Sequence, residues 1–119
     1  MFETLFLKEG GLMSKIVGKW EITVGALAGF SYSFDAKGNF EANLPAYNVK
    51  SSGTYKTNES VTPHELNLTV TEHTYGDAGK GDLLGIFEIE GDMLKMKLNE
   101  PNKPRWTDPS AYFYYQKQG

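Results

Sequence analysis

The feature that most constrains this fold is a two-residue alternation of apolar and polar side chains in short segments. Trp20, Ile22 and Val24, for example, alternate with polar residues. This period places successive side chains on opposite faces of a β-strand. No helical period of useful length follows, so the chain predicts an all-β fold.

The alternation recurs between turn-forming residues along the rest of the chain. Glycine, asparagine, aspartate and proline mark the breaks between the segments. Eight short segments at spacings of about 8–15 residues are typical of an antiparallel sandwich or barrel. The expected strands are 17–25, 30–34, 40–44, 49–57, 66–71, 83–90, 94–98 and 110–118.

Composition narrows the class of protein. The 119 residues contain no cysteine, which excludes disulfides, thiolate metal sites and a cysteine nucleophile. The net charge is −3 and Arg105 is the single arginine, so a basic nucleic-acid surface is not expected. No apolar run approaches the ~20 residues of a membrane-spanning helix.

Residues 1–13 form an extension before the expected barrel domain of residues 14–119. Phe2, Leu5 and Phe6 have helical spacing, but a glycine pair follows before three turns are complete. A short lid helix, an apolar arm that docks on a partner subunit, and an expression scar or a start assigned upstream of Met13 all fit. The segment lacks the features of a secretory signal, so a cytoplasmic location is expected.

Two motifs carry a resemblance to a known family. Gly18-Lys19-Trp20 resembles the Gly-x-Trp signature that opens lipocalins and other calycins. The run from Gly85 to Met96, GIFEIEGDMLKM, followed by Pro104-Arg105, is similar to the GIYE-x-x-GDxLK…RP pattern of short bacterial lipocalin-like domains, although Trp106 replaces the last proline. The resemblance covers about residues 16–118 and implies an eight-stranded antiparallel up-and-down β-barrel.

The resemblance also implies structural roles for particular residues. Trp20, after Gly18, would plug the base of the barrel, and a cation near the last strand would cover its ring. Arg105 and Lys117 are the candidates for that cation. Gly91 and Asp92 would form a tight hairpin turn, for which glycine supplies a positive φ.

The leading functional hypothesis is that a small, largely apolar ligand binds inside the barrel without catalysis. A barrel of eight strands is either packed solid or holds one small ligand. Buried tyrosines favour a ligand with a polar group, or internal water, over a dry core. The interior candidates are Trp20, Phe30, Tyr32, Phe40, Tyr55, Leu68, Phe87 and Met96.

A second hypothesis is a protein–protein interaction module or homodimer. The expected strands 83–90 and 110–118 have apolar residues on both faces. A partner or the N-terminal arm would cover Leu84, Ile86, Phe113 and Tyr115. A third is a barrel-type isomerase or cyclase that uses a tyrosine or Glu72 inside the barrel, by fold-level analogy alone.

Metal and cofactor sites are not expected. His64, Glu72 and His73 are the nearest approach to a metal-binding set, but Glu72 and His73 are adjacent on a strand and point to opposite faces. The glycine-rich loop at 76–82 lacks the spacing and the following helix of a phosphate-binding loop.

Overall fold

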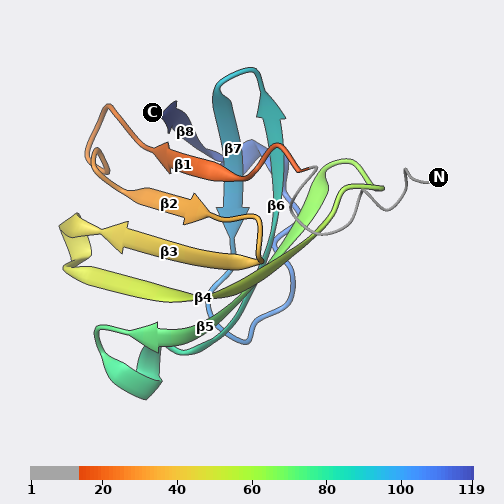
Figure 1. The fold of residues 1–119 in the computed structure, drawn as a ribbon. Coiled ribbons are helices and arrows are strands. Elements are labelled where there is room, and N and C mark those ends of the chain that lie inside the picture. The colour runs from red at the N-terminus through yellow and green to blue at the C-terminus, as the bar shows by residue number, and fades with distance from the viewer. Residues whose placement is uncertain (1–13) are drawn as a thin grey trace.

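The computed structural model describes residues 14–119, in which eight antiparallel strands close into one barrel (Figure 1). Each strand pairs with the next along the chain, and the last returns to the first, where Trp20 lies opposite Lys117. The up-and-down barrel predicted from the sequence is therefore confirmed. The strands are β1 (Gly18–Glu21), β2 (Ser31–Phe34), β3 (Asn39–Leu44), β4 (Val49–Asn58), β5 (His64–His73), β6 (Gly81–Glu90), β7 (Met93–Leu98) and β8 (Phe113–Gln118).

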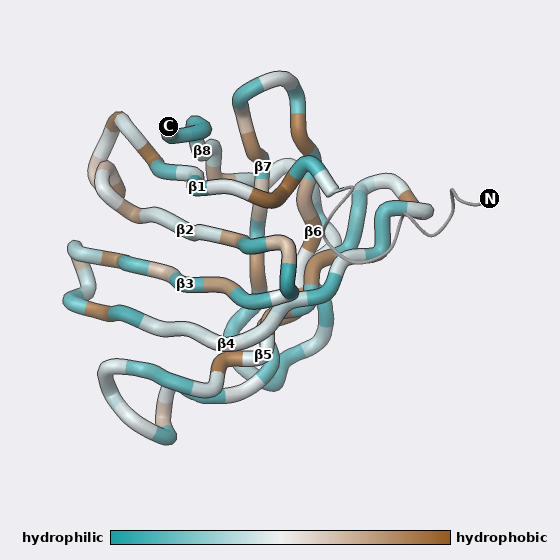
Figure 2. The backbone as a smooth tube through the Cα atoms, viewed as in Figure 1, coloured by the Kyte–Doolittle hydropathy of each residue, from teal (hydrophilic) through white to brown (hydrophobic). Residues whose placement is uncertain are grey.

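Alternation along the strands determines which side chains face the interior. Figure 2 shows hydrophobic and hydrophilic residues interchanging along the strands. The inward set is buried and forms one hydrophobic cluster. Because paired residues on neighbouring strands share a face, Trp20, Tyr32 and Ala42 stand side by side inside the barrel.

The first and last strands are shorter than the alternation predicted. β1 ends at Glu21, although Val24 continues the pattern; Val24 is 77% exposed. Gly25 and Gly29 adopt positive φ values of 88° and 99°, which turn the chain into a loop before β2. At the other end of the chain, a 3₁₀ turn at Pro109–Ala111 precedes β8.

Consecutive strands alternate in direction, so their connections divide between two ends of the barrel. We call the end with residues 14–17 and the connections 35–38, 59–63 and 91–92 the closed end. The end with the connections 22–30, 45–48, 74–80 and 99–112 is the open end. The 45–48 connection contains the 3₁₀ turn η3 (Pro45–Tyr47), and the 74–80 connection contains η4 (Gly76–Gly79).

The β6–β7 hairpin has the turn that the sequence predicted. Gly91 has a φ of 57°, a conformation that few residues other than glycine adopt. The carbonyl of Asp92 accepts a hydrogen bond of 2.8 Å from the Lys117 amide, so this turn is also tied to β8.

Arg105 has a different role from the one considered for it. Its guanidinium donates hydrogen bonds to the carbonyls of Leu66 and Gly85, at 3.2 and 2.8 Å, and to Asn67 Oδ1 at 2.6 Å. Its Nε lies 3.8 Å from a Glu65 carboxylate oxygen. Arg105 therefore fastens the 99–112 crossing to β5 and β6, and it does not cover Trp20.

The same crossing covers the outer face of β6. The Trp106 amide donates to the Leu84 carbonyl, and the Tyr112 hydroxyl donates to Glu88 at 2.8 Å. Ile86, which points outward between these two anchors, is only 3% exposed. The expectation that a partner or the N-terminal arm would cover this face is therefore wrong for Ile86, because the chain's own crossing covers it.

The structure also shows which face of β8 points into the barrel. Tyr115 points inward, opposite Leu94, and is 3% exposed, while Phe113 lies opposite Met96 and remains partly exposed at the open end. Tyr115 is thus a core residue and not part of an outer apolar face. The proposed N-terminal helix or arm lies in residues 1–13, outside the described residues, and a homodimer remains a prediction. Within residues 14–119, no helix has the length and apolar character needed to cross a membrane.

Candidate functional site

The interior of the barrel contains a hollow at its open end. The cavity has a volume of about 150 Å³ and opens between the start of β8 and the turn η3. Residues from β2, β3, β7 and β8, together with Phe30 just before β2 and Tyr47 of η3, converge there because these strands all begin or end at this edge. The lining residues are Phe30, Tyr32, Leu44, Tyr47, Met96, Lys97, Leu98, Phe113 and Tyr115.

The closed end is filled. Trp20 is completely buried, and its indole Nε1 donates a hydrogen bond of 2.8 Å to the carbonyl of Ile16. The ammonium of Lys117 lies 5.2 Å from the centre of the indole ring. Gly18 allows this approach, since a Cβ there would lie 3.1 Å from Lys117 Cε. Lys117 is therefore the cation that covers Trp20.

The eight interior residues predicted from the sequence divide between these two ends. Phe30, Tyr32 and Met96 line the cavity. The other five are buried in the packed part of the barrel and do not line it: Trp20, Phe40, Tyr55, Leu68 and Phe87. The structure thus brings three of the eight to one hollow.

Several lining residues were missed by the sequence interpretation. Leu44, Leu98 and Tyr115 follow the inward alternation of their strands, so the pattern itself could have identified them. Tyr47 lies on η3, where no period indicates its direction; its ring packs edge-on against Phe30 with centroids 5.3 Å apart.

Two buried tyrosines give the cavity its polar character. The rings of Tyr32 and Tyr115 meet edge to face at 5.7 Å. Burial raises the pKa of Tyr32 to about 12. The pKa of Tyr115 is also raised, first by burial and then by the neighbouring Tyr32. Both phenols therefore stay protonated at neutral pH and present hydrogen-bond donors.

These hydroxyls differ from those of the other tyrosines with polar contacts. Tyr55 donates to the Asp35 carbonyl at 2.6 Å, and Tyr75 donates to the Tyr47 carbonyl at 3.1 Å. Among residues 14–119, neither Tyr32 nor Tyr115 has a hydrogen-bond partner for its hydroxyl. A buried hydroxyl without a partner costs about 1–3 kcal/mol, which a bound acceptor would recover.

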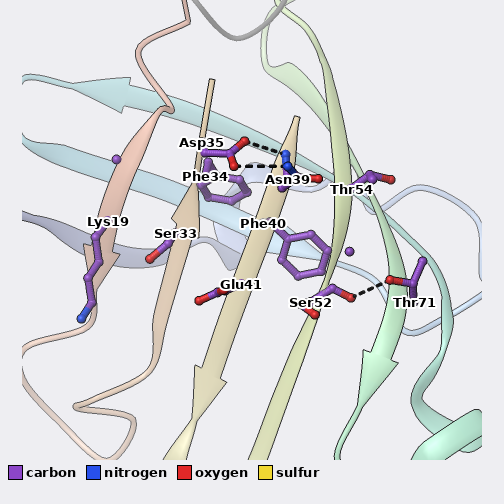
Figure 3. A pocket seen from close by; sticks show the side chains of 12 residues that line it. Lys19, Ser33, Phe34, Asp35, Asn39, Phe40, Glu41, Ser52, Thr54 and Thr71 are labelled. Carbon is purple, nitrogen blue, oxygen red and sulfur yellow. Dashed lines mark hydrogen bonds between the residues drawn. The ribbon is translucent and has the colours of Figure 1, made fainter. Parts of the chain in front are cut away.

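A second hollow lies on the outside of β1–β5 (Figure 3). It measures about 630 Å³ and is bordered by Lys19, Ser33 and Glu41, which are neighbours across β1, β2 and β3. Thr71 Oγ1 donates to the Ser52 carbonyl at 3.4 Å beside it. Phe34 and Phe40 also border it, but its charged groups are exposed and it lies open to solvent, whereas small-molecule sites usually enclose most of their ligand. The cavity at the open end is the stronger candidate.

The histidines have structural roles. His64 packs on Phe87 at 5.2 Å, and its Nδ1 lies 2.8 Å from the carbonyl of Val61. His73 Nδ1 accepts the Tyr75 amide, beneath the turn η4. Within the part of the chain that the structure describes, no three His, Asp or Glu residues gather as a metal site would require.

Glu72 is not inside the barrel. It lies opposite Ser52 on the outer face of β5 and is exposed. The expectation of an interior catalytic Glu72 is therefore wrong: the inward alternation of Leu66, Leu68 and Val70 would continue to Glu72, but a register shift between Ser52 and Gly53 interrupts it and places Glu72 on the outer face. The carboxyl groups with resolved pKa shifts, Asp35 and Asp108, are shifted downward by hydrogen bonds in their own turns.

Comparison of this chain with models of protein families, with curated proteins and with solved structures found no match. The lipocalin-like resemblance therefore stays a prediction based on the motifs in the sequence, beside a barrel whose topology the structure shows.

Proposed function

We propose that this protein binds a small, largely apolar molecule in the cavity at the open end of the barrel. The observation that carries the proposal is the contrast within one core: the closed end is packed around Trp20 and its neighbours, whereas a cavity of about 150 Å³ adjoins Met96 and Tyr115. Natural interiors are close-packed, so a hollow of this size at a solvent-facing edge favours an occupant.

The volume limits the occupant. An apolar cavity of about 150 Å³ holds a molecule the size of benzene. Ligand sites for larger molecules typically measure about 300–1,000 Å³. The ligand is therefore a single ring or a short branched chain, and any larger part would extend past Tyr47 and Phe113 into solvent.

The side chains that line the cavity also favour a ligand with an uncharged, apolar part. Phe30, Leu44 and Met96 are inward-facing and buried or partly buried. Transfer of a small ring from water to such a surface gains about 25 cal/mol for each Å² of apolar area. No catalytic step is part of the proposal.

An NMR titration with toluene tests the proposal. We expect saturable shifts of the backbone amides of Tyr32, Met96 and Tyr115, with no shifts around Tyr55 and Leu68, which pair with each other in the packed part of the barrel. Leu98→Phe fills the cavity and should abolish the shifts; Leu44→Phe fills it from another strand and serves if the first variant misfolds. Ser33→Thr, on the outer face, is the matched control and should bind as the unchanged chain does.

Absence of saturable shifts at the highest soluble concentration of toluene would overturn the proposal. So would binding that persists in both folded cavity-filling variants, because the ligand would then lie elsewhere.

A further inference from the structure

We propose, building on the function above, that the natural ligand carries a hydrogen-bond acceptor, a neutral carbonyl oxygen attached to a small apolar group, which the hydroxyls of Tyr32 and Tyr115 bind. The inference deepens the proposed function by naming the chemical class of the ligand.

Geometry is the first support. Tyr32 lies on β2 and Tyr115 on β8, strands that both flank β1, so their side chains reach the cavity from neighbouring parts of the wall. Their rings touch edge to face at 5.7 Å, and both residues are at least nine-tenths buried. Two tyrosine side chains from two strands thus line one small hollow.

Unmet hydrogen bonding is the second support. Neither hydroxyl has a partner among residues 14–119, whereas Tyr55 and Tyr112 each donate to an oxygen of the chain. A carbonyl oxygen has two lone pairs and can accept from both phenols at once. A ligand whose polar group only donates could reach the phenol oxygens alone and would leave both O–H donors without an acceptor.

Charge is the third support. Of the described residues that line the cavity, Lys97 alone carries a charge, and its ammonium lies 4.9 Å from the ring of Trp106 and 4.7 Å from that of Phe113. The Lys97 ammonium therefore already contacts two aromatic rings at the rim of the cavity. The buried wall is neutral, so a charged ligand group would lose its hydration without an opposite charge beside it.

Four probes of nearly equal size separate the alternatives: isopropylbenzene, acetophenone, benzoate and protonated 1-phenylethylamine. They differ in having no polar group, a carbonyl, an anion and a cation. We expect acetophenone to bind about tenfold more tightly than isopropylbenzene, because the gain is that of one or two net hydrogen bonds. The amine should bind least.

The variants Tyr32→Phe, Tyr115→Phe and the double variant remove only the hydroxyls. In the double variant the preference should reverse, so that isopropylbenzene binds more tightly than acetophenone. Tyr55→Phe is the matched control: it removes a hydroxyl that donates to Asp35, away from the cavity, and should keep the tenfold preference.

The outcomes separate this inference from the proposed function. If isopropylbenzene and acetophenone both bind with equal affinity, the cavity binds ligands but water alone satisfies the two phenols, and the inference is overturned. Tighter binding of benzoate than of acetophenone would likewise overturn the neutral class. If no probe binds, the proposed function itself fails.

Discussion

The two ends of the barrel are built from the same alternating strands and differ in how completely their groups are partnered. At the closed end, the indole N–H of Trp20 has the Ile16 carbonyl, its ring has the Lys117 ammonium, and the Tyr55 hydroxyl has the Asp35 carbonyl. At the open end, a cavity of about 150 Å³ adjoins two phenols without partners among the described residues. The difference indicates that one end provides stability and the other accepts a ligand.

The largest expected effect is on the closed end. Trp20→Ala removes a fully buried ring, its hydrogen bond and its cation contact, and should lower the free energy of unfolding by about 3–5 kcal/mol. Phe113→Ala, at the 38% exposed rim of the open end, should cost roughly 1 kcal/mol. Urea unfolding measures both, and similar losses would remove the contrast between the ends.

Alkaline pH should destabilise the barrel, and Tyr32 at the open end should account for part of the loss. The pKa of Tyr32 is about 12 in the folded state, against 10.0 for a tyrosine side chain in water. The unfolded chain therefore releases this proton first, so ionisation of Tyr32 leaves the free energy of unfolding unchanged below pH 10 and lowers it as the pH rises from 10 to 12. Two pKa units correspond to about 3 kcal/mol.

Denaturant unfolding at several pH values measures this loss. Tyr32→Phe should flatten the decline between pH 10 and 12 relative to the unchanged chain. A variant whose stability falls as steeply as before would show that Tyr32 is not a source of the decline.

The smallest effect compares two tyrosines. Tyr55→Phe should cost about 1 kcal/mol, since it leaves the Asp35 carbonyl without its 2.6 Å donor. Tyr32→Phe should be neutral or slightly stabilising at pH 7 in the ligand-free protein, because the hydroxyl it removes has no partner in the described chain. Thermal unfolding of the two variants tests the difference; equal losses would mean that Tyr32 is satisfied in the folded state.

Much of this architecture could be read from local pattern. Inward residues such as Phe40 and Leu68 follow directly from the alternation, because a strand's side chains have a fixed period. The cover over Trp20 could be narrowed to Lys117 or Arg105 but not chosen, since register across β1 and β8 decides it. The limit of β1 was missed because Gly25 and Gly29 break a pattern that Val24 continues.

The rest depends on contacts between distant segments. Nothing near Arg105 in the sequence indicates that it would bind carbonyls of Leu66 and Gly85 and so place the crossing over β6. The cavity depends likewise on how far side chains from β3, β7 and β8 reach toward one another. A pattern states which way a residue points, while the volume left between residues is a property of the assembled barrel.

The most direct test of the central claim is a crystal of this protein pressurised with xenon, which enters dry apolar cavities. We predict one strong xenon site among Phe30, Met96 and Tyr115, and none beside Tyr55 or Leu68, which lie in the packed part of the barrel. Xenon at the closed end, or no xenon at the open end, would contradict the account of a barrel that is filled at one end and hollow at the other.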